Sequence, residues 1–231
     1  NFMVVAPILA ANDCGAFSSK NVMKIINDLK AKYSIDEDRI IVTGFSMGGC
    51  KTWDIIQEYP NLIAAAAPMD ATFEVGDNSY GNHVDGGINK SVSVPTYYVG
   101  GELTPLPELP FQAQKCLDRM KYILDLNKAD SAAKYTVKLD DKDSWENKFW
   151  GINGDFSKSF VDPKRKGKLT LQFFKKDETK CYNIFGSIDN QGHECREHTC
   201  EYAWRYLSNF SRDSNGQIKG GEIEELLKTI K

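Results

Sequence analysis

Apolar runs alternate with amphipathic stretches through the first half of the chain. Residues 2–9 form a continuous apolar run, which is typical of a strand buried on both faces. Three further strand-like segments follow, which read DEDRIIVTGF, LIAAAAPMD and SVPTYYVGG. Between and after them, apolar residues recur at helical spacing over residues 20–33, 51–59 and 111–126. Strands that alternate with helices predict parallel pairing through right-handed crossovers, so we expect an α/β fold with a layered sheet.

The pattern changes in the second half of the chain. The segments YTVKL, KLTLQFF and CYNIFGSID predict three more strands, and residues 199–210 and a short stretch of the tail predict helices. A polar stretch that carries tryptophans, residues 140–168, separates the first two of these strands. The chain has no internal repeat and no low-complexity linker. We therefore expect one domain over residues 1–231, with residues 140–168 as an insertion.

Composition argues against several kinds of partner. The 231 residues carry 29 basic and 32 acidic side chains, which gives a net charge of −3. No stripe of lysine and arginine stands out, so nucleic acid and anionic membranes are not expected as partners. The apolar runs are shorter than the roughly 20 residues of a membrane span. The chain opens directly on an apolar run, which indicates a mature or truncated piece that lacks upstream strands.

The cysteines and two glycosylation triplets bear on the cellular compartment. The six cysteines include no CxxC pair and no metal-finger spacing, so no metal site is predicted. Asn-x-Ser triplets at Asn89 and Asn209, together with the cysteines, favour a secreted, extracellular protein. The alternative is a cytosolic protein with buried free thiols. The sequence does not select a disulfide pairing.

A serine lies at the centre of a glycine-bearing turn. Residues 44–48 read GFSMG and match G-x-S-x-G, with a predicted strand before the motif and a predicted helix after it. This context favours Ser46 as a strained, exposed nucleophile over a chance match in a loop. We expect Gly44 and Gly48 to provide clearance, because a Cβ at either position would collide with the neighbouring strand or helix. The Met47 N–H is the expected first donor to a tetrahedral oxyanion.

A nucleophilic serine needs a base to take its proton. The chain has three histidines. His193 lies in the loop IDNQGHE, directly after an apolar strand and before the last long helix, where a base can reach back over the sheet. His198 lies at the start of that helix, and His83 precedes the expected acid. We therefore predict His193 as the base.

The acid that orients the imidazole is expected after the strand VPTYYVGG. A common hydrolase pattern has Asp three residues after the glycine, and counting from Gly101 this position is Thr104. Glu102 is the nearest carboxylate and is the predicted acid, with a solvated loop residue as its alternative role. Other carboxylates that could serve are Glu108, Asp140, Asp141 and Asp143.

Two blocks of sequence resemble a known family. The segment YSIDEDRIIVTGFSMGGCKTWDIIQEYPNLIAAAAPM resembles the central block of carbohydrate esterase family 1 and related polyhydroxyalkanoate-depolymerase-like esterases. The shared features are D-x-x-R before the strand, G-x-S-M-G-G, a Thr-Trp pair, Tyr-Pro at the helix end and an alanine-rich strand. NQGHE followed by EYAWRYLSNFSR is similar to the histidine loop and closing helix of the same group. The resemblance covers about residues 1–72 and 181–212.

The resemblance implies an α/β-hydrolase fold, with a mostly parallel sheet, helices on both faces and an aromatic-rich insertion before the histidine. It implies hydrolysis of esters on feruloylated or acetylated xylan or arabinoxylan by Ser46 and His193, without metal or organic cofactor. Feruloyl esterase is the leading activity; acetyl xylan esterase and polyester depolymerase are its close rivals. A non-catalytic carbohydrate-binding protein and a peptidase on the same fold are rivals of other classes. The family's second oxyanion donor comes from a loop before the first strand, and this chain has no counterpart there.

Aromatic residues in the insertion predict a substrate-binding surface. Trp145 and Trp150 lie among polar residues, as expected of a cleft wall that stacks on sugar rings or phenolic acids. Phe149, Phe156 and Phe160 belong to the same stretch. The alternative is that these rings anchor an irregular insertion to the core.

Two further tryptophans and two cysteines lie near the expected core and site. We expect Trp53 and Trp204, on predicted helices, to be core residues. Cys50 lies four residues after Ser46, and Cys195 lies two residues after His193. A disulfide at either cysteine would stiffen the site; the alternative is that both are buried free thiols.

Overall fold

The computed structural model describes residues 2–7, 18–71, 88–102, 113–129, 134–135 and 152–231. The chain divides into two compact units, Asn1–Asp36 and Glu37–Lys231. The expectation of one domain therefore stays a prediction.

The first unit contains one described helix and no described strand. Helix α1, Ser19–Lys32, begins after Ser18, whose side chain accepts a hydrogen bond from the Asn21 N–H. Residues 2–7 have no regular secondary structure and are exposed, so the buried strand predicted at residues 2–9 is wrong for this part. An apolar run becomes a strand only by pairing with another strand, and the described part of this unit offers none.

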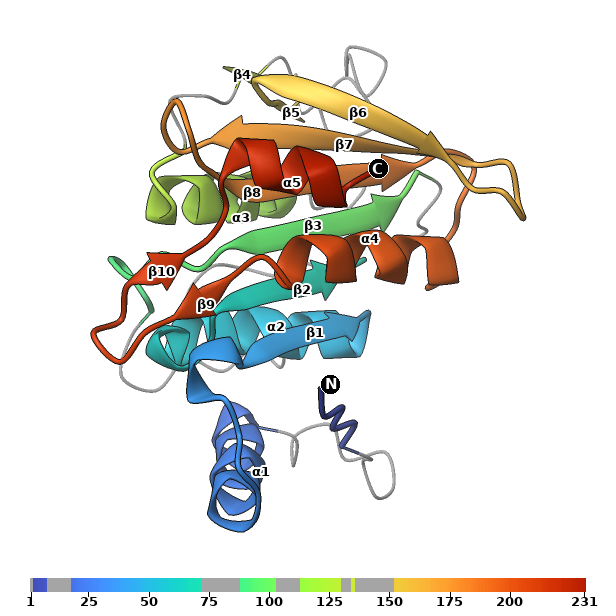
Figure 1. The fold of residues 1–231 in the computed structure, drawn as a ribbon. Coiled ribbons are helices and arrows are strands. Elements are labelled where there is room, and N and C mark those ends of the chain that lie inside the picture. The colour runs from blue at the N-terminus through green and yellow to red at the C-terminus, as the bar shows by residue number, and fades with distance from the viewer. Residues whose placement is uncertain (1, 8–17, 72–87, 103–112, 130–133, 136–151) are drawn as a thin grey trace. The chain divides into compact units, whose positions relative to one another are not determined.

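The second unit is built on a mixed sheet (Figure 1). Six strands of the described residues follow the order β1-β2-β3-β8-β7-β6. They are β1 Ile41–Phe45, β2 Ala65–Met69, β3 Thr96–Gly101, β6 Phe156–Val161, β7 Lys168–Lys175 and β8 Cys181–Ile188. β1, β2, β3 and β8 are parallel neighbours, whereas β7 and β6 are added as an antiparallel extension. Three of the five strand pairings are thus parallel, in agreement with the expected α/β sheet.

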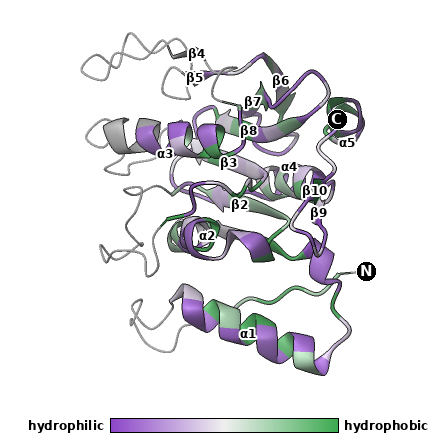
Figure 2. Ribbon diagram, turned by 90° about the vertical axis from the view of Figure 1, so that its left-hand side faces the viewer, coloured by the Kyte–Doolittle hydropathy of each residue, from purple (hydrophilic) through white to green (hydrophobic). Residues whose placement is uncertain are grey.

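Helices cover both faces of this sheet (Figure 2). α2 Met47–Glu58 and α3 Ala113–Leu126 lie on one face, and α4 Glu197–Leu207 and α5 Ile223–Thr229 lie on the other. The remaining elements are short. They are the 3₁₀ turns Glu37–Arg39 and Pro60–Leu62, the pair β4 Lys134–Tyr135 and β5 Ile152–Asn153, and the pair β9 Ser211–Arg212 and β10 Ile218–Lys219.

Burial across the sheet follows strand position. β2, β3 and β8 are buried along their whole length, as their continuous apolar sequences predict. β6 alternates between half-buried and exposed positions, and the sequence analysis did not identify it as a strand. Serine and lysine occupy three of its six positions, and lysine has weak strand propensity.

Aromatic residues of β6 belong to the core rather than to a cleft wall. Phe156 stacks on Phe173 with ring centroids 4.7 Å apart, and Phe160 packs against Tyr202 at 4.4 Å. For these two residues the core-anchoring alternative holds. Trp145, Phe149 and Trp150 lie outside the described residues.

The two helical tryptophans have different environments. Trp53 is fully buried and its indole N–H donates to the carbonyl of Ala71 at 3.0 Å, so its expected core position is confirmed. Trp204 is 43% exposed, so the same expectation is wrong for it. The face of α4 that packs on the sheet is formed by Tyr202, Ala203, Tyr206 and Leu207. The helical spacing places Trp204 off that face.

Neither glycosylation triplet presents a free side-chain amide. Asn89 is buried, and its amide donates to the carbonyls of Ile56 at 3.3 Å and Val92 at 2.8 Å. The Asn209 amide donates to the carbonyls of Arg205 at 2.6 Å and Tyr206 at 3.3 Å. A glycan would replace one of the two side-chain amide hydrogens at either position. The extracellular location stays a prediction.

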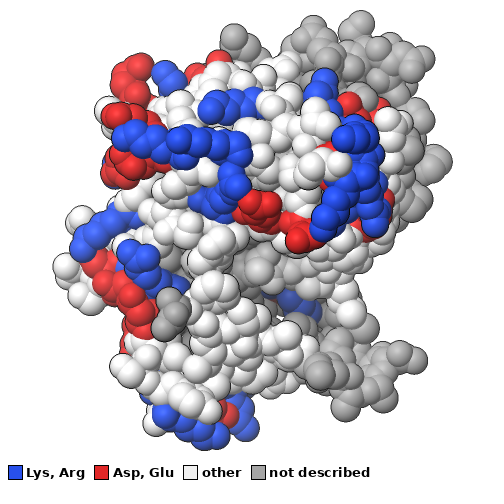
Figure 3. All heavy atoms as spheres, turned by 45° about the vertical axis from the view of Figure 1, so that its right-hand side comes forward, with Lys and Arg blue, Asp and Glu red and all other residues white. Residues whose placement is uncertain are grey.

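Acidic and basic side chains adjoin one another on the face shown in Figure 3. Ion pairs among the described residues include Arg196–Glu194 at 2.5 Å and Lys228–Glu225 at 2.7 Å. Charge of one sign therefore does not dominate that face. No helix among the described residues is long and apolar enough to cross a membrane.

Candidate active site

The motif serine occupies a sharp turn between a strand and a helix. β1 ends at Phe45 and α2 begins at Met47, so Ser46 alone joins them, with φ 53° and ψ −118°. A positive φ is uncommon for a residue with a side chain and stores strain. The Ser46 N–H donates to the carbonyl of Met69 at 2.9 Å, which ties the turn to β2. The helix starts four residues earlier than its apolar spacing predicts, because the glycines after Met47 lack apolar side chains.

The glycines around Ser46 have different roles from those expected. A Cβ on Gly44 would lie 2.2 Å from the carbonyl carbon of Gly48, so the expected crowding is confirmed there. A Cβ on Gly48 would meet nothing within 4 Å, so the expected collision at that position is wrong. The second crowded position is Gly49, where a Cβ would lie 2.7 Å from the carbonyl oxygen of Met69. The turn therefore needs glycine at 44 and 49 for close backbone approach.

Three side chains from distant parts of the sequence form a hydrogen-bonded chain. The Ser46 Oγ lies 2.7 Å from His193 Nε2, and His193 Nδ1 lies 3.0 Å from Asp70 Oδ2. The Asp70 side chain is 6% exposed and that of His193 is 24% exposed. The structure thus brings Ser46 and His193 together, as the motif and chain order predict, and adds Asp70.

Asp70 is held in place by the neighbouring strand. It directly follows β2 and has φ 51°, a left-handed conformation that aspartate tolerates. Its N–H donates to the carbonyl of Val99 at 2.8 Å, and the Gly101 N–H approaches Asp70 Oδ1 at 3.4 Å. These bonds fix the carboxylate at the carboxyl end of the sheet, where it faces the imidazole.

Glu102, the acid predicted from sequence, occupies a different place. Its Oε2 accepts the backbone N–H of Asn190 at 2.7 Å, and the hydrogen bond to His193 Nδ1 comes from Asp70. Glu102 follows β3, one strand further along than Asp70. Asp70 was missed because the common hydrolase pattern places the acid after the later strand. The available signal was a carboxylate directly after the alanine-rich strand. Glu108, Asp140, Asp141 and Asp143 lie outside the described residues.

The loop that carries His193 packs closely on the end of β3. A Cβ on Gly101 would lie 2.4 Å from the carbonyl oxygen of Gln191, so the loop backbone rests directly on this glycine. Within the loop, the Gln191 side-chain amide donates to the carbonyl of Glu194 at 2.9 Å. Hydrogen bonds from Arg196 and from Arg165 lower the pKa of the Glu194 carboxyl, which keeps it ionised.

His198 does not join this site. His198 lies in the first turn of α4 and packs edge-on against Tyr202, with ring centroids 4.9 Å apart. His83 lies outside the described residues.

The imidazole of His193 is supported by an aromatic ring from the serine turn. The rings of Phe45 and His193 have centroids 4.7 Å apart and planes inclined by 31°. Met47, the predicted oxyanion donor, is the first residue of α2. The first N–H groups of a helix have no partner inside the helix and favour negative charge, so the geometry suits this role.

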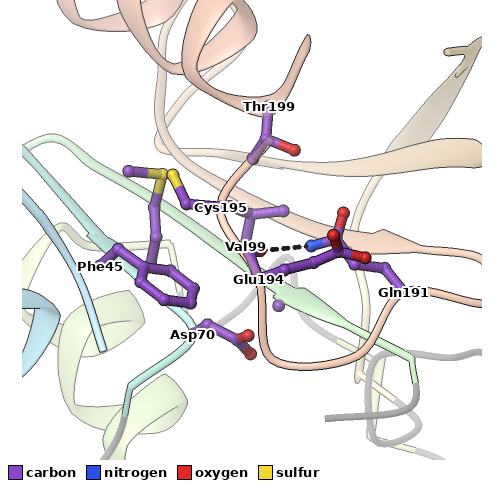
Figure 4. A pocket seen from close by; sticks show the side chains of 9 residues that line it. Phe45, Asp70, Val99, Gln191, Glu194, Cys195 and Thr199 are labelled. Atoms are coloured by element: carbon purple, nitrogen blue, oxygen red, sulfur yellow. Dashed lines mark hydrogen bonds between the residues drawn. The ribbon is translucent and has the colours of Figure 1, made fainter. Parts of the chain in front are cut away.

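A small cavity lies behind the His193 loop (Figure 4). Its volume is about 10 Å³, which is room for about one water molecule. The lining residues come from the ends of the central strands, from the loop and from α4: Phe45, Met69, Asp70, Val99, Gly100, Gln191, Glu194, Cys195 and Thr199. A cavity this small does not hold the acyl group of an ester. Trp145 and Trp150, predicted to bind substrate, lie outside the described residues.

The arrangement can activate a hydroxyl for attack. When His193 Nε2 accepts the serine proton, Nδ1 carries a hydrogen that is donated to Asp70, so the carboxylate fixes the tautomer. Among the described residues, no group of three or more histidine, cysteine or acidic side chains is arranged to hold a metal ion. The site geometry is that of a nucleophile, a base and an orienting acid.

Comparison with known proteins gives partial matches. No protein-family model matches the chain. The chain is 33% identical over 87 residues to the bifunctional acetylxylan esterase/xylanase XynS20E of Neocallimastix patriciarum. This match covers 38% of this chain and 12% of that protein. It is 34% identical over 55 residues to the poly(3-hydroxyalkanoate) depolymerase C of Paucimonas lemoignei. This match covers 24% of this chain and 13% of the depolymerase. The chain is a distant, partial relative of these two enzymes.

Two solved structures are similar to part of the chain. A thermostable esterase is 30% identical, with a TM-score of 0.34, and the match covers 46% of this chain and 25% of that one. An acetyl xylan esterase from Aspergillus awamori is 14% identical, with a TM-score of 0.49, and the match covers 82% and 66%. Both TM-scores are below 0.5, so these two similarities do not assign a fold or a function to the chain.

The crowding at Gly44 predicts a loss of stability on substitution. Gly44→Ala is expected to lower the free energy of unfolding by about 1–3 kcal/mol, because the new Cβ meets backbone atoms that cannot rotate away. Urea unfolding followed by circular dichroism measures this loss.

Gly48→Ala is the matched control, since its Cβ enters open space at a helical position. It should leave the protein unchanged or up to about 1 kcal/mol more stable. Equal losses in the two variants would contradict the structure of the turn.

Proposed function

We propose that the protein is a serine carboxylic ester hydrolase of the α/β-hydrolase type, with Ser46 as nucleophile, His193 as base and Asp70 as acid. The observation that carries this proposal is the hydrogen-bonded chain from Ser46 through His193 to Asp70, at 2.7 and 3.0 Å. The strained turn at Ser46 and the partial identity to an acetylxylan esterase add support. Asp70 replaces Glu102 in the acid role.

The geometry supports a two-step reaction. Ser46 Oγ attacks the ester carbonyl while His193 Nε2 accepts its proton, and the developing oxyanion lies near the Met47 N–H at the start of α2. His193 then returns the proton to the departing alcohol, which leaves an acyl group on Ser46. Water activated by the same imidazole releases the acid. Asp70 stabilises the imidazolium that forms in each step.

The substrate proposed first is acetylated xylan. The support is the identity to the acetylxylan esterase/xylanase, whose matched segment contributes 87 residues. A polyester is the second candidate, supported by the shorter match to the depolymerase. Xylan lies outside the cell, so the activity proposed on it goes with a secreted protein.

Feruloyl esters, expected from the aromatic stretch, have less support than the sequence suggested. Phe156 and Phe160 pack into the core of the sheet rather than lining a cleft. Of the aromatic residues in that stretch, Trp145, Phe149 and Trp150 remain as candidates to bind a feruloyl group, and they lie outside the described residues.

A variant without the Ser46 hydroxyl distinguishes an esterase from a non-catalytic carbohydrate-binding protein. Ser46→Ala is expected to abolish ester turnover while the melting temperature stays near that of the unchanged protein, because the half-buried hydroxyl is lost without a cavity in the core. A fluorophosphonate probe should label the parent protein and not the variant. Xylan binding by a parent protein that resists labelling would instead identify a non-catalytic carbohydrate-binding protein.

The two rival acids can be told apart by isosteric amides. Asp70→Asn is expected to lower kcat by about 10⁴-fold, because an amide no longer stabilises the required imidazole tautomer and its cation. Glu102→Gln retains an oxygen acceptor for the Asn190 N–H and should change kcat less than about threefold. Steady-state kinetics on an activated acetyl ester measures both. A large loss for Glu102→Gln alone would restore Glu102 as the acid.

A panel of three esters tests the acyl group and the polymer. We expect kcat/KM to be highest on acetylated xylan, lower on 3-hydroxybutyrate oligomers, and at least about tenfold lower on methyl ferulate. This order follows the two partial matches, 87 residues to the acetylxylan esterase/xylanase and 55 residues to the depolymerase; a bulky aromatic acyl group would in addition need a pocket lined to hold it. Fastest turnover of methyl ferulate would overturn the acetyl assignment and favour a feruloyl esterase.

A further inference from the structure

Two exposed thiols face each other beside the loop that carries His193. Cys195 lies two residues after His193, and Cys200 lies in the first turn of α4. Their sulfur atoms are 3.3 Å apart, and both residues are exposed. The pair therefore bridges the loop and the helix at a point open to small reagents.

The thiols of this pair differ from the buried thiol of β8. The hydrogen bond with Cys200 lowers the pKa of Cys195 to about 7 and raises the pKa of Cys200. Burial raises the pKa of Cys181 to about 12, so that thiol stays protonated. Because the thiolate is the reactive form, Cys195 is the thiol that reacts first.

We propose that Cys195 and Cys200 form a disulfide that fastens the His193 loop to the start of α4. The cross-link needs little movement, since the sulfur atoms are already in contact and the residues are joined by a short segment of chain. The contact assigns a disulfide pairing to two of the six cysteines, whereas the spacing of cysteines in the sequence selects no pairing.

The reaction with a small disulfide such as glutathione disulfide is balanced as follows. The Cys195 thiolate attacks one sulfur of the reagent, the reagent's S–S bond breaks, and one glutathione leaves as a thiolate. Cys200 then loses its proton to solvent and attacks Cys195 Sγ, which releases the second glutathione. The two protein thiols lose two electrons and two protons, and the two released thiols carry them.

The cross-link would act on the position of the imidazole. The loop rests on Gly101 by backbone contact, and Cys195 lines the same small cavity as Asp70 (Figure 4). A covalent tie at Cys195 therefore limits how far His193 can move from Asp70. This consequence for catalysis rests on the proposed function; the existence of the disulfide does not.

Peptide mapping tests the disulfide directly. The protein is equilibrated with glutathione disulfide, the remaining thiols are alkylated, and trypsin cleaves after Arg196, which separates the two cysteines. We expect residues 181–196 and 197–205 to be recovered as one species that is linked through Cys195 and Cys200, carries alkylated Cys181 and is split by reduction. Recovery of both peptides alkylated at Cys195 and Cys200 after this treatment would overturn the proposal, whatever the activity.

Single serine variants test what the cross-link does. Reduction of the parent protein should lower its melting temperature by about 4–8 °C, because a short covalent loop constrains the unfolded chain. Cys195→Ser and Cys200→Ser should each melt at the temperature of the reduced parent, and reduction should not shift them further. A parent protein that melts at the same temperature with and without reductant would contradict this role.

Kinetics then separates positioning from general stability. Below the melting range of all forms, reduction should lower kcat on an activated acetyl ester several-fold with KM unchanged, and not affect either serine variant. An unchanged kcat alongside a mapped disulfide would overturn the positioning role alone. An intact disulfide in a protein without esterase activity would overturn the proposed function and leave the cross-link standing.

Discussion

The parallel alignment of β1, β2, β3 and β8 is the constraint on which the site depends. Parallel strands end at the same edge of a sheet, so the residues that follow them are brought together. Ser46 follows β1, Asp70 follows β2, and the His193 loop follows β8. Ser46 and His193 are 147 positions apart in the chain, yet their side chains lie 2.7 Å apart. The sheet order, rather than any local motif, makes this contact.

Backbone strain is concentrated where the strands end. Ser46 and Asp70 both have positive φ, and both are held by the next strand of the sheet. The Ser46 N–H bonds to the carbonyl of Met69, and the Asp70 N–H bonds to the carbonyl of Val99. Such conformations persist only when the surroundings over-determine them. The buried central strands supply that rigidity, so Ser46 and Asp70, the proposed nucleophile and acid, are held in place before a substrate binds.

The base is held differently from the nucleophile and the acid. His193 lies in a loop beyond β8, and its position depends on side chains and close backbone contacts. Glu102 accepts the Asn190 N–H on one side of the loop, and Cys195 meets Cys200 on the other. The carboxylate predicted as the acid thus supports the same loop from outside the hydrogen-bonded chain. The catalytic proposal and the disulfide proposal concern the same structural problem, which is how to hold an imidazole on a loop.

The sequence by itself determined the elements and the chemistry that depend on near neighbours. The alternation of strands and helices, the turn at Ser46 and the choice of His193 follow from local pattern and chain order. Only the tertiary structure decided which carboxylate meets the imidazole, because Asp70 and Glu102 each directly follow a buried strand and the sequence does not indicate which strand end faces His193. The exposure of Trp204, in contrast, agrees with the helical spacing of the residues that α4 buries. The contact between Asp70 and His193 joins residues 123 positions apart, about which the spacing of apolar and polar residues carries no information.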